Sequence, residues 1–549
     1  MTTLRGVIGR SGPWLPLIGV SAIVGTLGTL AMPVVLGHTI DAVIAGTGTG
    51  RWLAIVAALI AVGVLCEAVD VLAGTACLAG TTAWLRGRLV RHLLAIGPQA
   101  LRRFDTGDLV SRISGNATDA AHVGVSAVSI AVAVLPPVGS LVLLAVIDPA
   151  VAVAFLAGLA LVALVLRAFT RRTTEVVGDY QRAQGRIAAR LAESLTGART
   201  IAAAGTVARE RQRVLEPLPE LRAHGIRAWR ALSRTSAEAG IVGPLVLVAV
   251  LAAGGFALVD GRITAGELLA ASRYAVIGAG LGSLTGQLGG LARARAAVGR
   301  ADEVLGVPPV HYGHRNLPRG SGRLEFRGVT VHAGQTRLLD GVDMTVPGGA
   351  TAAIVGRSGS GKSILAELAA RLRDPDEGSV RLDGVPLAEL RHDALRAAVG
   401  CAFERPVLVG GTVADAIGLG FDGDRVRAAA RATHAHDFVS RLPNGYDTPL
   451  AEAPMSGGEA QRLGLARAWH ATRVLVLDDA TSSLDVVTEL QISRALAGDR
   501  GERTRLVVTH RTGTADRADL VVWLESGRLR GVGLHRLLWN DADYRRVFQ

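Results

Sequence analysis

The sequence is poor in cysteine and in aromatic residues, and both scarcities exclude classes of protein. Its three cysteines, Cys66, Cys77 and Cys401, are scattered over 549 residues, so neither a disulfide framework nor a zinc-ligand spacing is present. Aromatic residues make up 4% of the chain, and no basic stripe is interleaved with them. We therefore expect no nucleic-acid partner, although the formal net charge is +12.

Apolar sequence, by contrast, is abundant, and it is concentrated in the first part of the chain. Runs at 13–36, 52–84, 121–146, 149–169, 238–259 and 267–290 are each long enough for a helix to cross about 30 Å of hydrocarbon. The part after them reads as an ordinary soluble domain. The sequence predicts an all-α, six-helix transmembrane domain over 1–305, a Pro/Gly-rich linker over 306–322 and a second domain over 323–549.

The arginines predict the orientation of the chain in the membrane. They crowd the segments 85–120 and 167–237, whereas only Arg51 and Arg262 lie near the opposite connections. The positive-inside rule therefore places both long segments, the N-terminus and the C-terminal domain in the cytoplasm of a multi-pass plasma (inner) membrane protein.

Two short patterns interrupt these cytoplasmic segments. The first is Thr106-Gly107-Asp108, which predicts either a helix break followed by a short helix across the tip of a hairpin, or a solvated turn. The second, the stretch 193–201, is similar.

Two acidic residues lie inside the second apolar run. Glu67 and Asp70 are three residues apart, so both lie on one face of a helix. Burying each at mid-membrane would cost about 3 kcal/mol, so each should face a wet cavity or a partner. A cation-attracting translocation path and a structural pair nearer the interface both remain open.

A glycine-rich segment in the second domain has the pattern of a phosphate-binding loop. It follows the apolar strand 350–355 and precedes a helical pattern, and its residues are Gly356, Arg357, Ser358, Gly359, Ser360, Gly361, Lys362 and Ser363. The backbone N–H groups would cradle phosphates, Lys362 would reach the β and γ oxygens, and Ser363 would bind Mg²⁺. Lys362 is the only lysine among 59 basic residues, so the sequence keeps its one compact ammonium at this position.

Two further strands end in residues that suit the same chemistry. The apolar run 474–477 ends at Asp478, which we predict to be a Mg²⁺ ligand, and Asp479 then points to where an attacking water would lie. The run 505–509 ends at His510, which we place against the γ-phosphate.

The order of these motifs, together with Met455-Ser456-Gly457-Gly458-Glu459-Ala460-Gln461-Arg462 and Ser482-Ser483-Leu484-Asp485, resembles the ATP-binding cassette (ABC) family. Thr106-Gly107-Asp108-Leu109 followed by Ser111-Arg112 is similar to the first coupling segment of ABC exporters. The resemblance covers essentially the whole chain. It implies an α/β P-loop NTPase cassette, ATP and Mg²⁺ as cofactors, and a head-to-tail dimer. In that dimer Ser456, Gly457, Gly458 and Glu459 would contact the nucleotide held by the partner.

The sequence departs from the family pattern at its own nucleotide site. Asp479 replaces a glutamate, Glu404 replaces a glutamine that contacts Mg²⁺ and water, and the segment 329–333 lacks the aromatic residue that stacks on adenine, for which His332 is a weak substitute. A carboxylate retracted by about 1 Å can cost roughly 100-fold in a positioned reaction. We therefore expect a heterodimer whose sister chain carries the glutamate, with a slow homodimer as the alternative.

The resemblance implies ATP-driven export of an amphiphilic small molecule, lipid or peptide by one half of a dimeric transporter. Import of a metal-chelate and a catalytically silent regulatory subunit are the alternatives. The expected partners are a second half-transporter, membrane lipids and a substrate that the sequence does not identify.

Overall fold

A computed structural model describes residues 1–549 except 1, 47, 99–101, 279–281 and 499–502. The chain divides into two compact units, residues 1–94 with 104–307 and residues 95–103 with 308–549.

The first unit is helical in its described residues. Its elements are α1 (Thr2–Arg10), α2 (Trp14–Ala45), α3 (Thr49–Ile96), α5 (Thr106–Ser111), a π-helical turn (Arg112–Asn116), α6 (Ala117–Ala133), α7 (Leu135–Ile147), α8 (Pro149–Thr196), α9 (Ala198–Ala203), α10 (Val207–Leu215), α11 (Leu218–Val259), α12 (Ala265–Gly278) and α13 (Gly282–Leu305).

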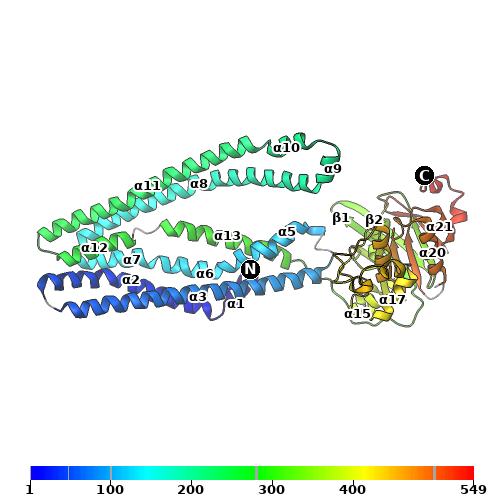
Figure 1. The fold of residues 1–549 in the computed structure, drawn as a ribbon, viewed down its shortest axis with the longest axis horizontal. Coiled ribbons are helices and arrows are strands. Elements are labelled where there is room, and N and C mark those ends of the chain that lie inside the picture. Colours follow the sequence, from blue (N-terminus) through cyan, green and yellow to red (C-terminus); the bar gives the residue numbers. More distant parts are fainter. Residues whose placement is uncertain (1, 47, 99–101, 279–281, 499–502) are drawn as a thin grey trace. The chain divides into compact units, whose positions relative to one another are not determined.

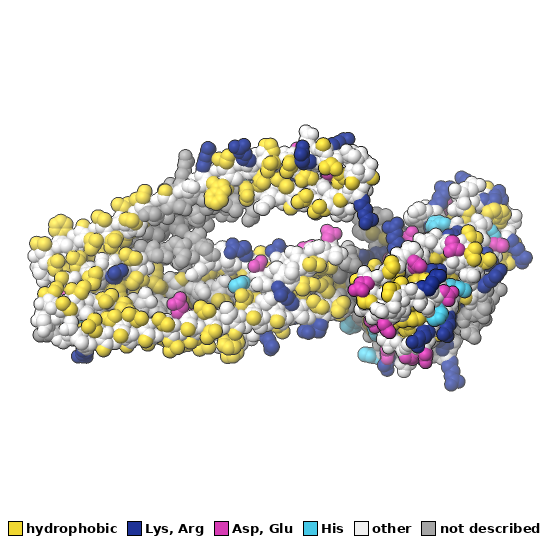
Figure 2. All heavy atoms as spheres, in the orientation of Figure 1, with side chains coloured by type: hydrophobic (Ala, Val, Ile, Leu, Met, Phe, Trp, Pro, Cys, Tyr) yellow, Lys and Arg dark blue, Asp and Glu magenta, His cyan; other side chains and the backbone are white. Residues whose placement is uncertain are grey.

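Within the described residues, four stretches are long and apolar enough to cross a membrane: Trp14–Ala45, Thr49–Ile96, Thr106–Ile147 and Ile241–Val259. Pro149–Leu161 is a shorter apolar stretch of α8. The predicted run 267–290 falls on α12 and α13, and its residues 279–281 lie outside the described part. Figure 2 shows hydrophobic side chains gathered over the end of the unit that holds α2, α7 and α12, and arginines toward the end with α9 and α10.

The helices of this unit pack through apolar residues and small ones. The long helices α8 and α11 lie side by side (Figure 1). Phe155 of α8 and Tyr274 of α12 are fully buried, and the Tyr274 hydroxyl donates to the Leu30 carbonyl over 2.6 Å. Gly37 of α2 and Gly266 of α12 approach so closely that a Cβ on Gly37 would lie 2.5 Å from the Gly266 oxygen.

Both predicted interruptions are breaks between helices. α5 begins at Thr106 after Asp105, whose backbone is extended, so the segment restarts as a short helix and not as a solvated turn. Further along, α8 ends at Thr196 and α9 begins at Ala198.

The second unit contains two sheets with surrounding helices. Its strands are β1 (Leu324–Ala333), β2 (Thr336–Val346), β3 (Thr351–Val355), β4 (Glu377–Leu382), β5 (Val385–Pro386), β6 (Val399–Phe403), β7 (Val474–Asp478), β8 (Thr504–Val508), β9 (Leu520–Glu525) and β10 (Arg528–Gly533). Its α-helices are α14 (Lys362–Ala369), α15 (His392–Ala398), α16 (Val413–Gly418), α17 (Gly423–Ala432), α18 (His436–Val439), α19 (Gly457–Ala468), α20 (Val486–Gly498), α21 (Thr512–Arg517), α22 (His535–Leu538) and α23 (Ala542–Arg545).

The larger sheet positions the site. Its strand order is β10-β9-β3-β8-β7-β6, and β9, β3, β8, β7 and β6 are parallel. The strands β3 and β7 are continuous apolar runs because both faces of a parallel sheet are buried. The carboxyl ends of parallel strands lie at one edge, which is where ligands bind in open α/β sheets.

Candidate functional site

The phosphate loop, residues 356–363, joins β3 to α14 and requires its glycines. Gly359 and Gly361 have φ angles of +79° and +100°, which side chains other than glycine rarely adopt. A Cβ on Gly356 would lie 2.3 Å from the Leu524 oxygen, and one on Gly361 would lie 2.6 Å from Leu339 Cδ2. The loop therefore closes tightly against its neighbours, and only glycine fits at these positions.

Lys362 and Ser360 are the buried polar side chains of this loop. Lys362 Nζ donates to the carbonyl oxygens of Gly356 (2.8 Å) and Arg357 (2.9 Å), and burial lowers the pKa of Lys362. The Ser360 hydroxyl is buried without a hydrogen-bond partner. A buried cation and an unsatisfied hydroxyl beside a glycine cradle fit a phosphate group.

Asp478 ends β7 beside this loop. The Ser363 hydroxyl donates to Asp478 Oδ1 over 3.1 Å, and burial raises the pKa of Asp478 despite that hydrogen bond. A hydroxyl paired with a carboxylate is an oxygen donor set that suits Mg²⁺, which keeps water and phosphate oxygens as its other ligands. Within the described residues no group of three or more His, Cys, Asp or Glu could hold a metal by itself.

Asp479 and His510 lie next to one another at the same edge. Asp479 has a φ of +49°, and its Oδ2 lies 3.6 Å from His510 Nε2. Burial raises the pKa of Asp479, and the nearby His510 and Lys362 oppose that shift. The His510 side chain is half exposed, and that of Asp479 is 23% exposed.

Glu404 follows β6 and is exposed at this edge. Phe403 pairs with Asp478 in the sheet, which brings Glu404 next to the two aspartates, and its charge contributes to their raised pKa values after the larger effect of burial. His332 lies in β1, where its N–H donates to Asp376, and no ring contact involves it among the described residues.

The residues Ser456, Gly457, Gly458 and Glu459 form the start of α19. Ser456 and Glu459 cap the helix reciprocally: the Glu459 carboxylate accepts from the Ser456 N–H and hydroxyl, each over 2.8 Å, and the Glu459 N–H donates to the Ser456 hydroxyl. In the described part of the chain, no hydrogen bond or ion pair joins them to the phosphate loop. The structure thus brings together the loop, Asp478, Asp479, His510 and Glu404, and leaves the start of α19 outside that group.

Two residues at this edge received no role from the sequence. Gln461 of α19 is 2% exposed and donates hydrogen bonds to the Glu404 carbonyl and the Ser482 hydroxyl. Arg511, which follows His510, donates to the Ser482 carbonyl over 3.2 Å. Gln461 belongs to the motif 455–462, and its polarity two residues before the apolar Leu463 was a further signal.

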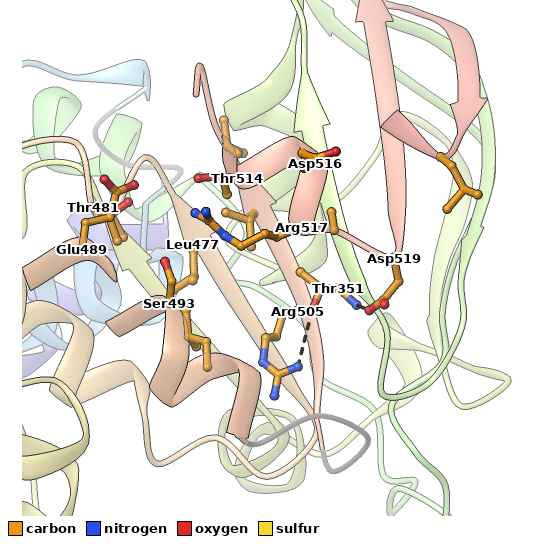
Figure 3. Close-up of a pocket in the computed structure, with 16 residues that line it drawn as sticks. Thr351, Leu477, Thr481, Glu489, Ser493, Arg505, Thr514, Asp516, Arg517 and Asp519 are labelled. Carbon is orange, nitrogen blue, oxygen red and sulfur yellow. Dashed lines mark hydrogen bonds between the residues drawn. The ribbon is translucent and has the colours of Figure 1, made fainter. Parts of the chain in front are cut away.

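A cavity of 570 Å³ lies in the same unit, and its described lining does not include the phosphate loop. Figure 3 shows Thr481 and Glu489 at one end of the drawn residues and Thr351 and Asp519 at the other. Arg505 donates to the Thr351 hydroxyl over 3.4 Å (Figure 3).

Glu67 and Asp70 line a groove of 610 Å³ between α2 and α3, together with Thr26, Thr29 and Cys66 among others. One carboxylate oxygen of Asp70 is buried without a hydrogen-bond partner. The structure therefore places both acids along a groove of mixed polar and apolar lining within the apolar helices.

These features define a class of protein: a multi-pass helical membrane domain joined to an α/β domain that binds nucleoside triphosphates with a phosphate loop. Comparisons with known proteins agree with this class. Residues 15–278 match the family model described as ABC transporter transmembrane region, and residues 339–482 match the model described as ABC transporter.

Similar proteins span nearly the whole chain. It is 48% identical to the ABC transporter ATP-binding protein RamA of Streptomyces coelicolor over 97% of this chain and 84% of that protein. It is 31% identical to an ATP-dependent lipid A-core flippase of Chromohalobacter salexigens over 85% of this chain and 82% of that protein. The structure of a bacterial Atm1-family ABC exporter with ATP bound has the same fold, with a TM-score of 0.79 and 24% identity over 96% of each chain.

The chain belongs to the ABC transporter family. It is an exporter-type half-transporter: a membrane protein with a cytoplasmic, ATP-binding ATPase domain that couples ATP to export. Half-transporters of this kind dimerise and act on substrates at the membrane. The predicted family, fold class, ATPase activity and membrane location are confirmed, and the import alternative is not favoured.

Proposed function

We propose that the phosphate loop binds the triphosphate of ATP around Lys362, and that Ser363 and Asp478 hold an accompanying Mg²⁺ ion, with Glu404 near it. The 3.1 Å contact between the Ser363 hydroxyl and Asp478 carries this proposal, because it sets two Mg²⁺-type ligands beside the loop. Bound Mg²⁺ would supply positive charge to the phosphates. We also propose that the transmembrane domain ends at residue 305, that the linker spans 306–322, and that the ATP-binding domain begins at residue 323.

We propose further that hydrolysis at this chain's own site is weak. Asp479 would orient the attacking water and His510 would contact the γ-phosphate, as their 3.6 Å separation allows. The shorter aspartate would place its carboxylate farther from the phosphate than a glutamate would, and the Glu404 carboxylate would offset part of the positive charge that Mg²⁺ supplies to the phosphates. The helix start at Ser456, Gly457, Gly458 and Glu459 would serve the partner's nucleotide, so a sister chain with a glutamate is the favoured partner.

The substrate that we propose is an amphiphilic molecule with a lipid-like part. Two similar proteins support this class by name: the lipid A-core flippase cited above, and a fatty acid ABC transporter ATP-binding/permease protein of Mycobacterium bovis, 30% identical over 78% of this chain and 70% of that protein. The polar groove at Glu67 and Asp70 would add affinity for a cationic group on such a molecule.

Replacing Lys362 tests the ATP-binding proposal. We expect Lys362→Arg to lose at least about tenfold in affinity for labelled ATP, because the bulky planar guanidinium does not fit where the compact ammonium contacts the Gly356 and Arg357 carbonyls. Arg319→Lys, an exposed position, is the matched control and should bind as the unsubstituted protein does. Equal ATP affinity in the Lys362→Arg variant would contradict the proposal.

A further inference from the structure

Gln461 is a polar side chain enclosed in the cassette, five residues after the helix start at Ser456. Its neighbours Leu463 and Leu465 belong to apolar cores. Its amide nitrogen donates to the Glu404 carbonyl (2.6 Å) and the Ser482 hydroxyl (3.1 Å), and its amide oxygen accepts from the Ser483 N–H (3.0 Å). Three of its four hydrogen-bonding positions are thus filled inside the protein, so the side chain is fixed in place.

The partners of Gln461 lie on the two segments that carry the nucleotide site. Glu404 directly follows β6, and Ser483 comes four residues after Asp479. Gln461 contacts backbone atoms of Glu404 and Ser483. These contacts therefore depend on the backbone position of each segment and not on its side chains. These hydrogen bonds therefore join both segments to α19.

The segment 481–484 is held from a second direction by Arg511. This arginine donates to the Ser482 carbonyl over 3.2 Å and forms an ion pair with the buried Glu489 of α20. At the start of α19, a Cβ on Gly458 would lie 3.2 Å from the Ser483 oxygen, so helix and segment are in close contact. Thr481 and Glu489 line the cavity of 570 Å³ (Figure 3), which leaves open space on that side of the segment.

We propose that Gln461 is a positioning residue that couples this chain's own nucleotide site to the helix start that it offers to its partner. The inference rests on the proposed function, since it requires a nucleotide in the cradle beside Asp479. Gln461 touches no reacting atom. It bonds the segment after β6 and the segment after β7 to α19. When a nucleotide shifts these two segments, the start of α19 therefore moves with them.

The test uses the full-length transporter in lipid nanodiscs, with its sister chain if one is required. Gln461→Met keeps the length of the side chain and removes all three hydrogen bonds, whereas Gln461→Glu keeps the acceptor for the Ser483 N–H and loses the donor to Glu404. Thr433→Val is the matched control. Thr433 is likewise buried, its hydroxyl donates to the Ala429 carbonyl over 3.0 Å, and no described contact joins it to the segments after β6 and β7.

We expect Gln461→Met to lower kcat by about tenfold or more while KM and labelled-ATP binding stay within about twofold, because displacement of positioned groups affects the reacting state first. Gln461→Glu should lower kcat at least as much, because its buried carboxylate would place an oxygen against the Glu404 carbonyl, and Thr433→Val should keep the unsubstituted kcat. If the Met variant does not fold, the Glu variant provides the same comparison.

Two results would overturn the coupling role. One is an unchanged kcat in Gln461→Met. The other is a drop in kcat matched by an equal loss of ATP affinity and melting temperature, since that is what a purely structural residue would give. Failure of the unsubstituted transporter to bind ATP would instead overturn the proposed function, so the two failures are distinguishable.

Discussion

Asp479 combines a short side chain with an unusual backbone. Its φ of +49° lies in the left-handed region, where aspartate is several-fold enriched over most residues. Burial raises the pKa of its carboxylate, and the nearby His510 and Lys362 lower it. A single methylene therefore decides how far this carboxylate reaches into the cradle.

Lengthening this side chain should speed up hydrolysis. We expect Asp479→Glu to raise the ATPase kcat by about tenfold, because the carboxylate advances by roughly 1 Å toward the attacking water. Asp479→Asn, which matches the original in size but lacks the charge, should be slower than the original. The measurement is phosphate release at saturating ATP, and a Glu variant no faster than the original would show that the aspartate does not limit this site.

At the residue scale, the sequence predicted what lies close together along the chain. The loop around Lys362 was predictable because its glycine spacing and its flanking strand and helix are local. The role of Gln461 was not predictable, since it bonds Glu404, 57 residues earlier, and Ser482, 21 residues later. Asp478 and His510 fall between these cases: each ends a recognisable strand, but only the sheet order brings the strand ends to one edge.

At the element scale, α2 and α12 meet through glycine. Gly37 and Gly266 touch backbone to backbone, and Asp41, one turn beyond Gly37, accepts hydrogen bonds from the Thr264 hydroxyl (2.7 Å) and the Gly266 N–H (2.9 Å). Close approach of small residues is a recurrent way to pack helices in a membrane, where burial of apolar surface gives no drive for association. The pair of helices is thereby fixed at this end.

Adding a methyl group at this contact should separate the two helices. Gly37→Ala would place a Cβ 2.5 Å from the Gly266 oxygen, so we expect it to destabilise the protein by about 1–3 kcal/mol. Gly28→Ala on the same helix meets no atom within 4 Å and should be neutral or stabilising by up to about 1 kcal/mol. Thermal unfolding in detergent checks the pair, and equal melting temperatures would contradict the close packing.

The apolar runs predicted where helices lie, but not how they pair. A segment that is apolar all round carries no sign of which face meets a neighbour, so the contact of α8 with α11 and that of α2 with α12 had to come from the structure. The run 121–146 also falls on two helices, α6 and α7, because Pro136 and Pro137 follow the break at Val134.

At the scale of the whole molecule, one chain contains a cradle with a shortened carboxylate and a helix start that is fully capped. In the proposed dimer the first would hold this chain's own nucleotide and the second would contact its partner's. With the weak hydrolysis that we propose for its own cradle, the chain would support hydrolysis across the interface better than in that cradle, which is why we favour a pair of different chains.

The pairing is tested by purifying the chain alone and with its candidate sister. We expect the chain alone to bind ATP but to hydrolyse it at least about tenfold more slowly than the pair, since the shorter carboxylate would limit both sites of a homodimer. Gly457→Ala tests the contact with the partner's nucleotide, because a Cβ at this position would have no atom of its own chain within 4 Å. It should leave binding intact and slow the pair. Brisk, substrate-stimulated hydrolysis by the chain alone would contradict the heterodimer.

The solitary lysine has a practical consequence. With 58 arginines and one lysine, the chain offers a single side-chain amine to acylating reagents, and burial lowers the pKa of that amine, which favours its nucleophilic form. In the purified protein, an amine-selective probe that modifies a side chain therefore reports on the phosphate loop alone, and occupancy of the cradle can be followed as protection from labelling.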